Sequence, residues 1–284
     1  MKQVTEGFRK PVLLKGLFSN TTAGMHWDKP GYLKAKLGDL KVPVYGSLTN
    51  SSGGLNHQQK DVALLSSGDV TEEIMVTKKS NHRFIFPQLA IAETNASDPA
   101  AMSAKAEELM EDVELHRLRT GWGKKGHFNY IGQQIFIGCG LTDKNAYEGI
   151  TWHTEPGNNW FIQVTGMKRW YLVAPKDSAL MLPTKKTGRL MITADIPYMT
   201  KLHDRLPIMY ADVGAGDAIF NPEWYWHKTK IYPGPSISIS MREFYTWRNL
   251  KSSPHYALQF FLRLPFEMQT ATFIKKFMKK MFQI

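Results

Sequence analysis

The chain has 284 residues, 43% hydrophobic and 21% charged, which is typical of a globular protein with a sizeable core. Its single cysteine, Cys139, excludes an intramolecular disulfide and a cysteine-based zinc cluster, so we expect a reducing compartment, cytoplasmic or nuclear. No stretch reaches the roughly 18 apolar residues that a transmembrane helix needs, and we expect no secretory signal at the N-terminus. The formal net charge of +11 favours anionic partners, RNA among them, although the lysines are mostly scattered.

Residues 1–115 mix short apolar runs with turn-forming residues, and we expect an α/β extension packed on the main domain. Pro11–Phe18 is predicted to be a strand, and Asp28–Leu40 a short helix. Ala100–Leu118 has the clearest helical pattern, because its apolar residues recur mostly at three- and four-residue spacings. Helices and strands are therefore both expected in this part of the chain.

Residues 116–247 are predicted to form a mainly β domain, because the apolar pattern changes to the period of strands after Gln134. The expected strands are Ile135–Cys139, Trp160–Thr165, Arg169–Val173, Ala218–Asn221 and Ile237–Met241. Many short strands divided by glycines and prolines favour a β-sandwich or barrel.

Residues 248–284 are predicted to end in an amphipathic helix. An apolar stripe that includes Phe273 and Phe277 lies opposite a lysine face that includes Lys275 and Lys279. We expect this helix to pack on its own domain or to form a homodimer. A membrane surface or a partner helix are the alternatives.

A candidate metal site is formed by His153, Glu155 and His227. Side chains two residues apart on a strand point the same way, so His153 and Glu155 share a face. With His227, which follows the predicted strand Ala218–Asn221, they offer two imidazoles and one carboxylate. This ligand set leaves open positions on the metal and suits non-heme Fe(II), while zinc also accepts the same ligand types.

The triplet His26-Trp27-Asp28 shows that a histidine two residues before a carboxylate is a weak signal on its own. It lies at the start of the predicted helix Asp28–Leu40, where we expect Asp28 to be the N-cap before Pro30. Additional residues are therefore needed to support the site at His153.

A cationic pocket next to the candidate metal site provides that support. Lys168 lies 15 residues after His153 at the start of a predicted strand, from which it can cross the barrel. A buried ammonium needs a carboxylate partner. Ser236, Ser238 and Ser240 alternate with isoleucines and place hydroxyls on one face of the last strand, which would complete a carboxylate-binding pocket.

With these residues the chain resembles the JmjC (cupin-like) family of Fe(II)- and 2-oxoglutarate-dependent oxygenases, over roughly Pro11 to Phe244. The most specific stretches are His153-Thr154-Glu155, Asn159 through Arg169 and Gly216 through His227. The resemblance is strongest to the small hydroxylases that act on an asparagine of the hypoxia pathway and on tRNA wybutosine. It implies a double-stranded β-helix, the jelly-roll or cupin fold, as the core.

The resemblance also implies roles for individual residues. His153, Glu155 and His227 would bind Fe(II), and Lys168 would bind the distal carboxylate of 2-oxoglutarate. Three further residues are expected in the cosubstrate pocket: Asn159, Thr151 and Ser240.

The sequence departs from the pattern of the small hydroxylases at several positions. Glu155 stands where they usually carry Asp, and Arg242 stands near their Asn. A cosubstrate-binding tyrosine of the family has no clear counterpart, and Tyr130 or Tyr171 are the candidates to replace it.

The implied reaction uses O2 to hydroxylate a C–H bond and releases succinate and CO2. We expect a polypeptide side chain as the substrate. A modified RNA nucleoside, a methylated histone lysine and a small molecule are alternatives. A further hypothesis from another class is a non-catalytic cupin-fold binding protein. Trp224, Tyr225 and Trp226 could wall the pocket, with core packing expected for at least two of them.

Overall fold

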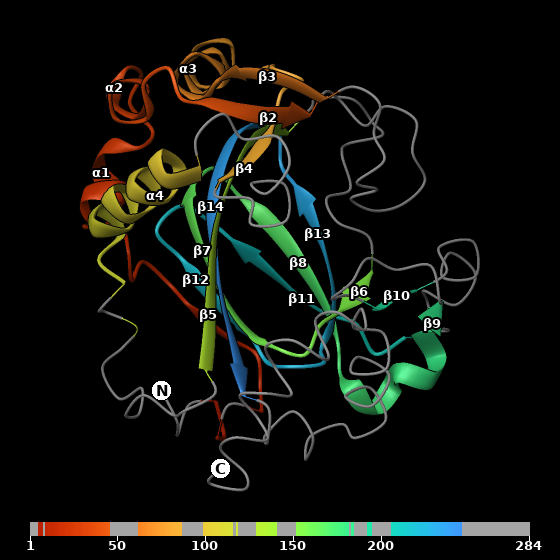
Figure 1. Ribbon diagram of the computed structural model, residues 1–284. Helices are drawn as coiled ribbons and strands as arrows, with labels where there is room; N and C mark the ends of the chain where they lie inside the picture. Colours follow the sequence, from red (N-terminus) through yellow and green to blue (C-terminus); the bar gives the residue numbers. More distant parts are fainter. Residues whose placement is uncertain are drawn as a thin grey trace, which may run out of the picture.

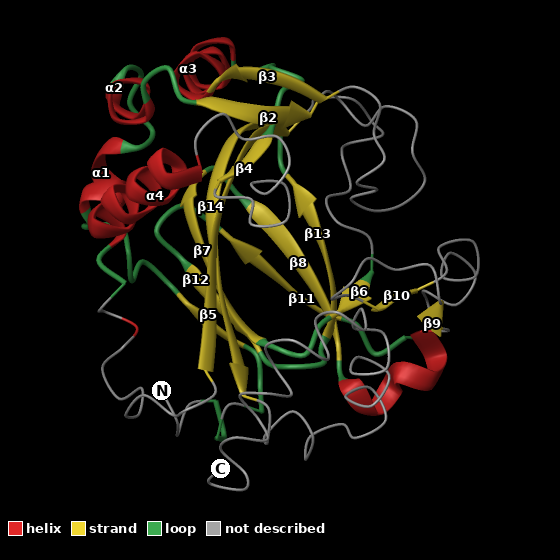
Figure 2. Ribbon diagram, in the orientation of Figure 1, coloured by secondary structure: helices red, strands yellow, loops and turns green. Residues whose placement is uncertain are grey.

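A computed structural model describes residues 5–7, 9–45, 62–86, 99–115, 118, 129–140, 152–181, 183–184, 192–194 and 206–245. Two six-stranded antiparallel sheets form the body of the molecule, and the α-helices of the described residues gather on one side of it (Figure 1, Figure 2). This mainly β architecture agrees with the predicted jelly-roll core. The predicted C-terminal helix lies outside the described residues.

The first sheet has the strand order β1-β12-β7-β14-β5-β4. Its strands are β1 (Val12–Leu14), β12 (Ala218–Asn221), β7 (Asn158–Thr165), β14 (Gly234–Tyr245), β5 (Asn129–Gly140) and β4 (Phe84–Phe86). Four of the five strands predicted after residue 134 lie within it. Both edge strands, β1 and β4, come from the N-terminal 115 residues, and β1 is shorter than predicted because the chain turns at Gly16, which has a positive φ of 66°.

The second sheet has the order β11-β8-β13-β6-β10-β9. Its strands are β11 (Met209–Val213), β8 (Lys168–Val173), β13 (Trp226–Ile231), β6 (His153–Thr154), β10 (Ile192–Ala194) and β9 (Pro183–Thr184). A 3-10 helix, η1 (Pro175–Met181), follows β8 and packs against this sheet, where the indole of Trp226 donates to the Ser178 hydroxyl at 2.9 Å.

The remaining elements come from the N-terminal part of the chain. They are α1 (Thr22–His26), α2 (Tyr32–Leu37), β2 (Lys41–Tyr45), β3 (Val62–Ser66), α3 (Ser67–Thr77) and α4 (Pro99–Val113), with β2 and β3 paired as a separate ribbon. The helix predicted at Ala100–Leu118 corresponds to α4.

The predicted N-cap at Asp28 is wrong. Helix α2 begins after Gly31, whose φ is 83° and which provides no side-chain cap. Helix α1 was not predicted from the sequence. It is capped by the Thr21 hydroxyl, which accepts a 3.0 Å bond from the Gly24 amide. The helix expected at Asp28–Leu40 is therefore present in shorter form as α2, and α1 is an additional helix before it.

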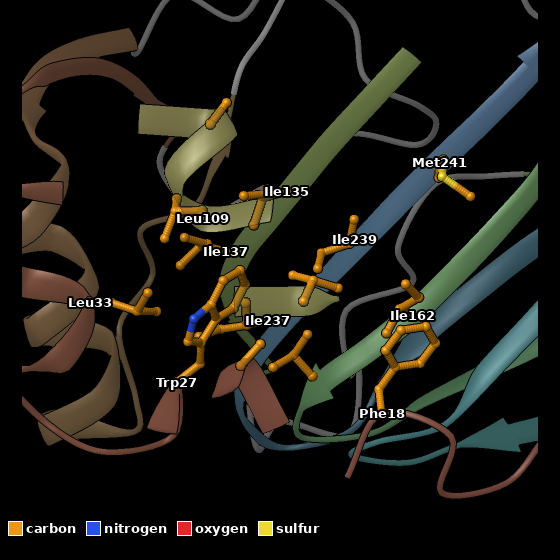
Figure 3. Close-up of a cluster of buried hydrophobic side chains, with 14 of the residues drawn as sticks. Phe18, Trp27, Leu33, Leu109, Ile135, Ile137, Ile162, Ile237, Ile239 and Met241 are labelled. Carbon is orange, nitrogen blue, oxygen red and sulfur yellow. The ribbon is translucent and has the colours of Figure 1, made fainter. Parts of the chain in front are cut away.

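A hydrophobic core lies between the helices and the outer face of the first sheet (Figure 3). Trp27 and Leu109 come from the helical side, while Ile237 and Ile239 come from β14, and all four are at most 1% exposed. Each such side chain stabilises the fold by about 1.5–3 kcal/mol on burial. Because side chains alternate along a strand, the serines of β14 face the interior between the two sheets.

No helix within the described ranges is long and apolar enough to cross a membrane.

Candidate metal centre

The three predicted ligands meet where β6 and β13 pair. His153 and His227 are register partners across the two strands, and their ring centroids are 4.0 Å apart. Oε1 of Glu155 lies 3.9 Å from Nε2 of His227. All three side chains are buried, with 2–4% exposure, and one ligand atom from each lies within 4.8 Å of the others. The structure therefore brings together the His-x-Glu triplet and the distant histidine.

Glu155 reaches the cluster although β6 ends one residue earlier, at Thr154. Its backbone carbonyl accepts a hydrogen bond from the Trp224 amide at 3.0 Å, which fixes the chain beyond the strand. Trp152, two residues before Thr154, packs into a separate hydrophobic cluster on the other face of the second sheet. The predicted alternation of side chains around His153 is therefore present.

The hydrogen-bonding contacts of His227 are made by Nδ1 and leave Nε2 available for a metal. Nδ1 lies 3.0 Å from the Tyr225 carbonyl and 3.2 Å from the side-chain amide nitrogen of Asn221. Because the carbonyl can only accept, it favours the tautomer with the proton on Nδ1 and a lone pair on Nε2. Burial, followed by the neighbouring His153, holds the pKa of His227 well below its usual value. The neutral imidazole that metal binding requires is thus the favoured form.

Arg242 contacts the carboxylate of the cluster. Its Nε donates to Oε1 of Glu155 at 3.0 Å, and its Nη1 donates to Oε1 of Gln134 at 2.5 Å. The sequence identified Arg242 as a departure from the family pattern, but it did not predict these contacts, because Glu155 and Gln134 are 87 and 108 residues away in the chain.

Lys168 is buried inside the barrel with 6% exposure. Its ammonium donates to the Ser238 hydroxyl at 2.6 Å and lies 4.9 Å from the centroid of the Phe161 ring. Among the described residues no carboxylate pairs with it, and burial lowers the pKa of Lys168 to about 7. The site therefore contains a desolvated cation that is suited to an anionic ligand.

Aromatic contacts connect Lys168 to the metal-ligand cluster. Trp170 stacks on His227 with ring centroids 5.3 Å apart, and it meets Phe161 edge-on at 4.8 Å. Phe161 in turn lies under the Lys168 ammonium. On β8, Leu172 is the register partner of His227, so Lys168 enters the same interior about 13 Å further along the strand.

The remaining predicted pocket residues differ in where they lie. Ser240 donates to the Asn159 side chain at 2.8 Å, so both lie in the interior, but the serine that contacts Lys168 is Ser238. Asn159 is the register partner of Asn221 and Arg242 and thus sits beside the ligand cluster. Thr151 lies outside the described residues.

Tyr171 does not replace the missing family tyrosine. It lies next to the Lys228 ammonium at 5.1 Å, on the face of β8 opposite Lys168 and Trp170. The side chain of Tyr130 lies outside the described part of the structure.

The aromatic triplet before His227 agrees with the prediction that at least two of its members pack in a core. Trp224 and Trp226 are buried in the cluster that contains Trp152, and they are at most 1% exposed. Tyr225 packs against the interior cluster around Trp170 instead.

The donor set fits a divalent transition metal. Donor atoms bound to one ion at about 2.1 Å lie about 3 Å apart at right angles, so small side-chain rotations would bring all three onto one ion. Two imidazoles and one carboxylate occupy one side of such an ion and leave its other positions open. Ligand type alone is compatible with iron and with zinc.

A family model described as a cupin-like domain matches residues 5–249. The chain therefore belongs to this family of cupin-like, JmjC-type domains. The match extends across both sheets and the N-terminal helices. A comparison with curated proteins finds no match.

Proposed function

We propose that this protein is an Fe(II)- and 2-oxoglutarate-dependent dioxygenase that hydroxylates a C–H bond in a polypeptide side chain. The observation that carries the proposal is the joint presence of two groups in one interior: the buried cluster of His153, Glu155 and His227, and the buried ammonium of Lys168. A metal-ligand cluster alone would fit many metalloproteins. A buried lysine in the same interior adds a receptor for a carboxylate.

The three ligands would hold the iron from one side. Iron together with 2-oxoglutarate and O2 supplies the oxidising chemistry, with succinate and CO2 as the by-products. The neutral His227, whose Nδ1 lies against the Tyr225 carbonyl, would bind the metal through Nε2.

Lys168 would bind the distal carboxylate of 2-oxoglutarate. Its ammonium, which now contacts only the Ser238 hydroxyl among hydrogen-bond acceptors of the described residues, would gain a charged partner. The Ser238 hydroxyl is close enough to donate to the same carboxylate. A bound carboxylate favours the charged form of Lys168, so it would raise the lysine pKa from about 7.

The apolar wall between these two groups would exclude water. Phe161, Trp170 and Leu172 are at most 5% exposed and form one interior cluster. Exclusion of water would strengthen the pairing of Lys168 with an anion and limit side reactions.

A modified RNA nucleoside is the second candidate substrate, favoured by the excess of 36 basic over 25 acidic residues. A non-catalytic binding protein of the same fold would need neither three converging ligands nor a buried lysine. The two classes are separated by turnover, and the two substrates by product analysis.

The test is formation of succinate from 2-oxoglutarate by purified protein with Fe(II) and ascorbate, with and without candidate substrates. His153→Ala should abolish turnover. His26→Ala is a matched control, because it removes the histidine of the other His-x-acid triplet, and it should retain turnover. Absence of both metal binding and turnover in the wild type would exclude the oxygenase.

Mass spectrometry then identifies the substrate class by a +16 Da product. Peptide libraries and RNA are supplied in parallel to the same enzyme. Oxidised peptide supports the proposal, whereas oxidised nucleoside together with salt-dependent RNA binding would replace polypeptide by RNA.

A further inference from the structure

We infer that Arg242 is a positioning residue that holds the Glu155 carboxylate ready for the metal. The inference rests on the proposed metal site, and it assigns a role to a residue outside the ligand set.

The guanidinium of Arg242 is fixed at two points. Nε donates to Oε1 of Glu155 at 3.0 Å, while Nη1 donates to Oε1 of Gln134 at 2.5 Å. The side chain of Arg242 is 19% exposed and that of Glu155 is 5% exposed, so the pair is shielded from most solvent. A planar guanidinium with fixed donor directions orients its partners more strictly than an ammonium does.

The backbone of Arg242 is anchored on both sides. It lies in β14, where it is the register partner of Gly132 on β5 and of Asn159 on β7. Glu155, in contrast, follows the two-residue strand β6 of the second sheet. The Arg242–Glu155 contact therefore joins the first sheet to the ligand-bearing segment of the second.

Glu155 needs such a contact because the strand that carries His153 stops before it. The carbonyl bond to the Trp224 amide holds its backbone, but the longer glutamate side chain retains rotatable bonds. The oxygen bound by Arg242 is the same Oε1 that lies 3.9 Å from Nε2 of His227. A carboxylate oxygen accepts at more than one lone pair, so Oε1 can accept from Arg242 and still bind a metal beside His227.

The test measures metal binding directly with Co(II), which reports its ligands through its visible absorption bands. Arg242→Met should weaken Co(II) binding by about tenfold or more and shift the bands, the size of effect that follows loss of an outer hydrogen-bond partner. Arg242→Lys keeps the charge and should restore part of the affinity. Gln134→Met, which frees the other end of the guanidinium, should give a smaller loss in the same direction.

Arg169→Met is the matched control. Arg169 also pairs with a carboxylate, Asp212, through two bonds of 2.7 Å, but on the solvent side of the second sheet. Its loss should leave Co(II) affinity and spectrum unchanged. If Arg242→Met does not fold, as judged by circular dichroism, Arg242→Lys and Gln134→Met decide the question alone.

A double mutant separates action through Glu155 from a general charge effect. In the Glu155→Ala background, Arg242→Met should no longer weaken Co(II) binding. Wild-type affinity and spectrum in the folded Arg242 and Gln134 variants, or tighter binding in Arg242→Met, would overturn the inference while leaving the proposed function intact. Failure of the wild type to bind Co(II) would overturn both.

Discussion

The two faces of β14 carry opposite kinds of side chain. Ile237, Ile239 and Met241 point into the hydrophobic core under the helices, where they are at most 1% exposed. Ser238 and Arg242 point into the interior between the sheets, where Ser238 accepts from Lys168 and Arg242 donates to Glu155 and Gln134. One strand therefore contributes to the hydrophobic core on one side and to the candidate site on the other.

The two faces differ in how a side chain affects the free energy of unfolding. On the outer face, burial of apolar area is favourable wherever packing is dense. On the inner face, a hydrogen bond adds only about 0.5–1.5 kcal/mol net, and a buried ammonium opposes folding. Inner-face substitutions should therefore change binding and catalysis strongly, and outer-face substitutions should change stability.

The largest effect is expected for His227→Ala on the inner side. Loss of one of three ligands should lower 2-oxoglutarate turnover roughly a thousandfold or more, because the metal site is incomplete. Steady-state succinate formation and metal content measure the loss. The melting temperature should change little, and a collapse of the fold would contradict the proposed division between the two faces.

Ile239→Ala should have the reverse profile. Truncation of this fully buried side chain leaves a cavity and should lower the free energy of unfolding by about 2–5 kcal/mol. Chemical denaturation gives this value, and Co(II) binding at low temperature should persist. If the variant lost metal binding while keeping its stability, the two faces would not act independently.

Lys168→Met should stabilise the metal-free protein while abolishing high-affinity 2-oxoglutarate binding. The lysine pKa is about 7 in the folded protein and about 10.4 in the unfolded chain, so the unfolded chain binds more protons between these values. Wild-type stability should therefore rise as the pH increases from about 7 towards 10. Below pH 7 the lysine is charged in both states and its burial cost is greatest.

The advantage of Lys168→Met should accordingly be largest at pH 6, on the order of 2–4 kcal/mol, and should shrink above pH 7. Urea unfolding of both proteins from pH 6 to pH 9 measures the difference. A difference that stays constant with pH would show that Lys168 does not titrate in this range.

The smallest effect concerns the two serines. Ser240→Ala removes the donor to Asn159 and should lower the free energy of unfolding by about 1 kcal/mol, with a modest change in 2-oxoglutarate affinity. Ser238→Ala removes the partner of Lys168 and should weaken 2-oxoglutarate binding more. Calorimetric titration of both variants with 2-oxoglutarate measures the two affinity losses. A larger loss in Ser240→Ala would favour the sequence-based prediction that Ser240 is the serine of the cosubstrate pocket.

Local sequence patterns were sufficient to predict much of the fold and the ligand cluster. The alternation of Ser and Ile in residues 236–240 depends only on the period of a strand, and it correctly predicted which residues face the interior. The grouping of His153 with Glu155 depends on the same period. The glycine and proline turns around Ala218–Asn221 located the strand before His227.

Side-chain contacts between residues distant in the sequence, and the positions of helix N-caps, could not be predicted in the same way. Contact of Lys168 with Ser238, and not with Ser240, depends on the cross-strand register and the reach of one side chain. Glu155, one of the two partners of Arg242, follows a strand of the other sheet. Helix α2 begins after Gly31, which has a left-handed backbone conformation. The polar side chain of Asp28 led instead to a predicted N-cap three residues earlier.

The first strand of the chain has a consequence for biosynthesis. Val12 pairs with Phe220, so β1 can find its place only after more than 200 further residues have been synthesised. At about 5–20 residues per second this takes roughly 10–40 s, during which the apolar strand has no partner on the ribosome. The carboxylate of Asp217, which accepts from both Lys15 and the Gly16 amide, is made in the same late interval. Closure of this sheet edge is thus a late event in folding.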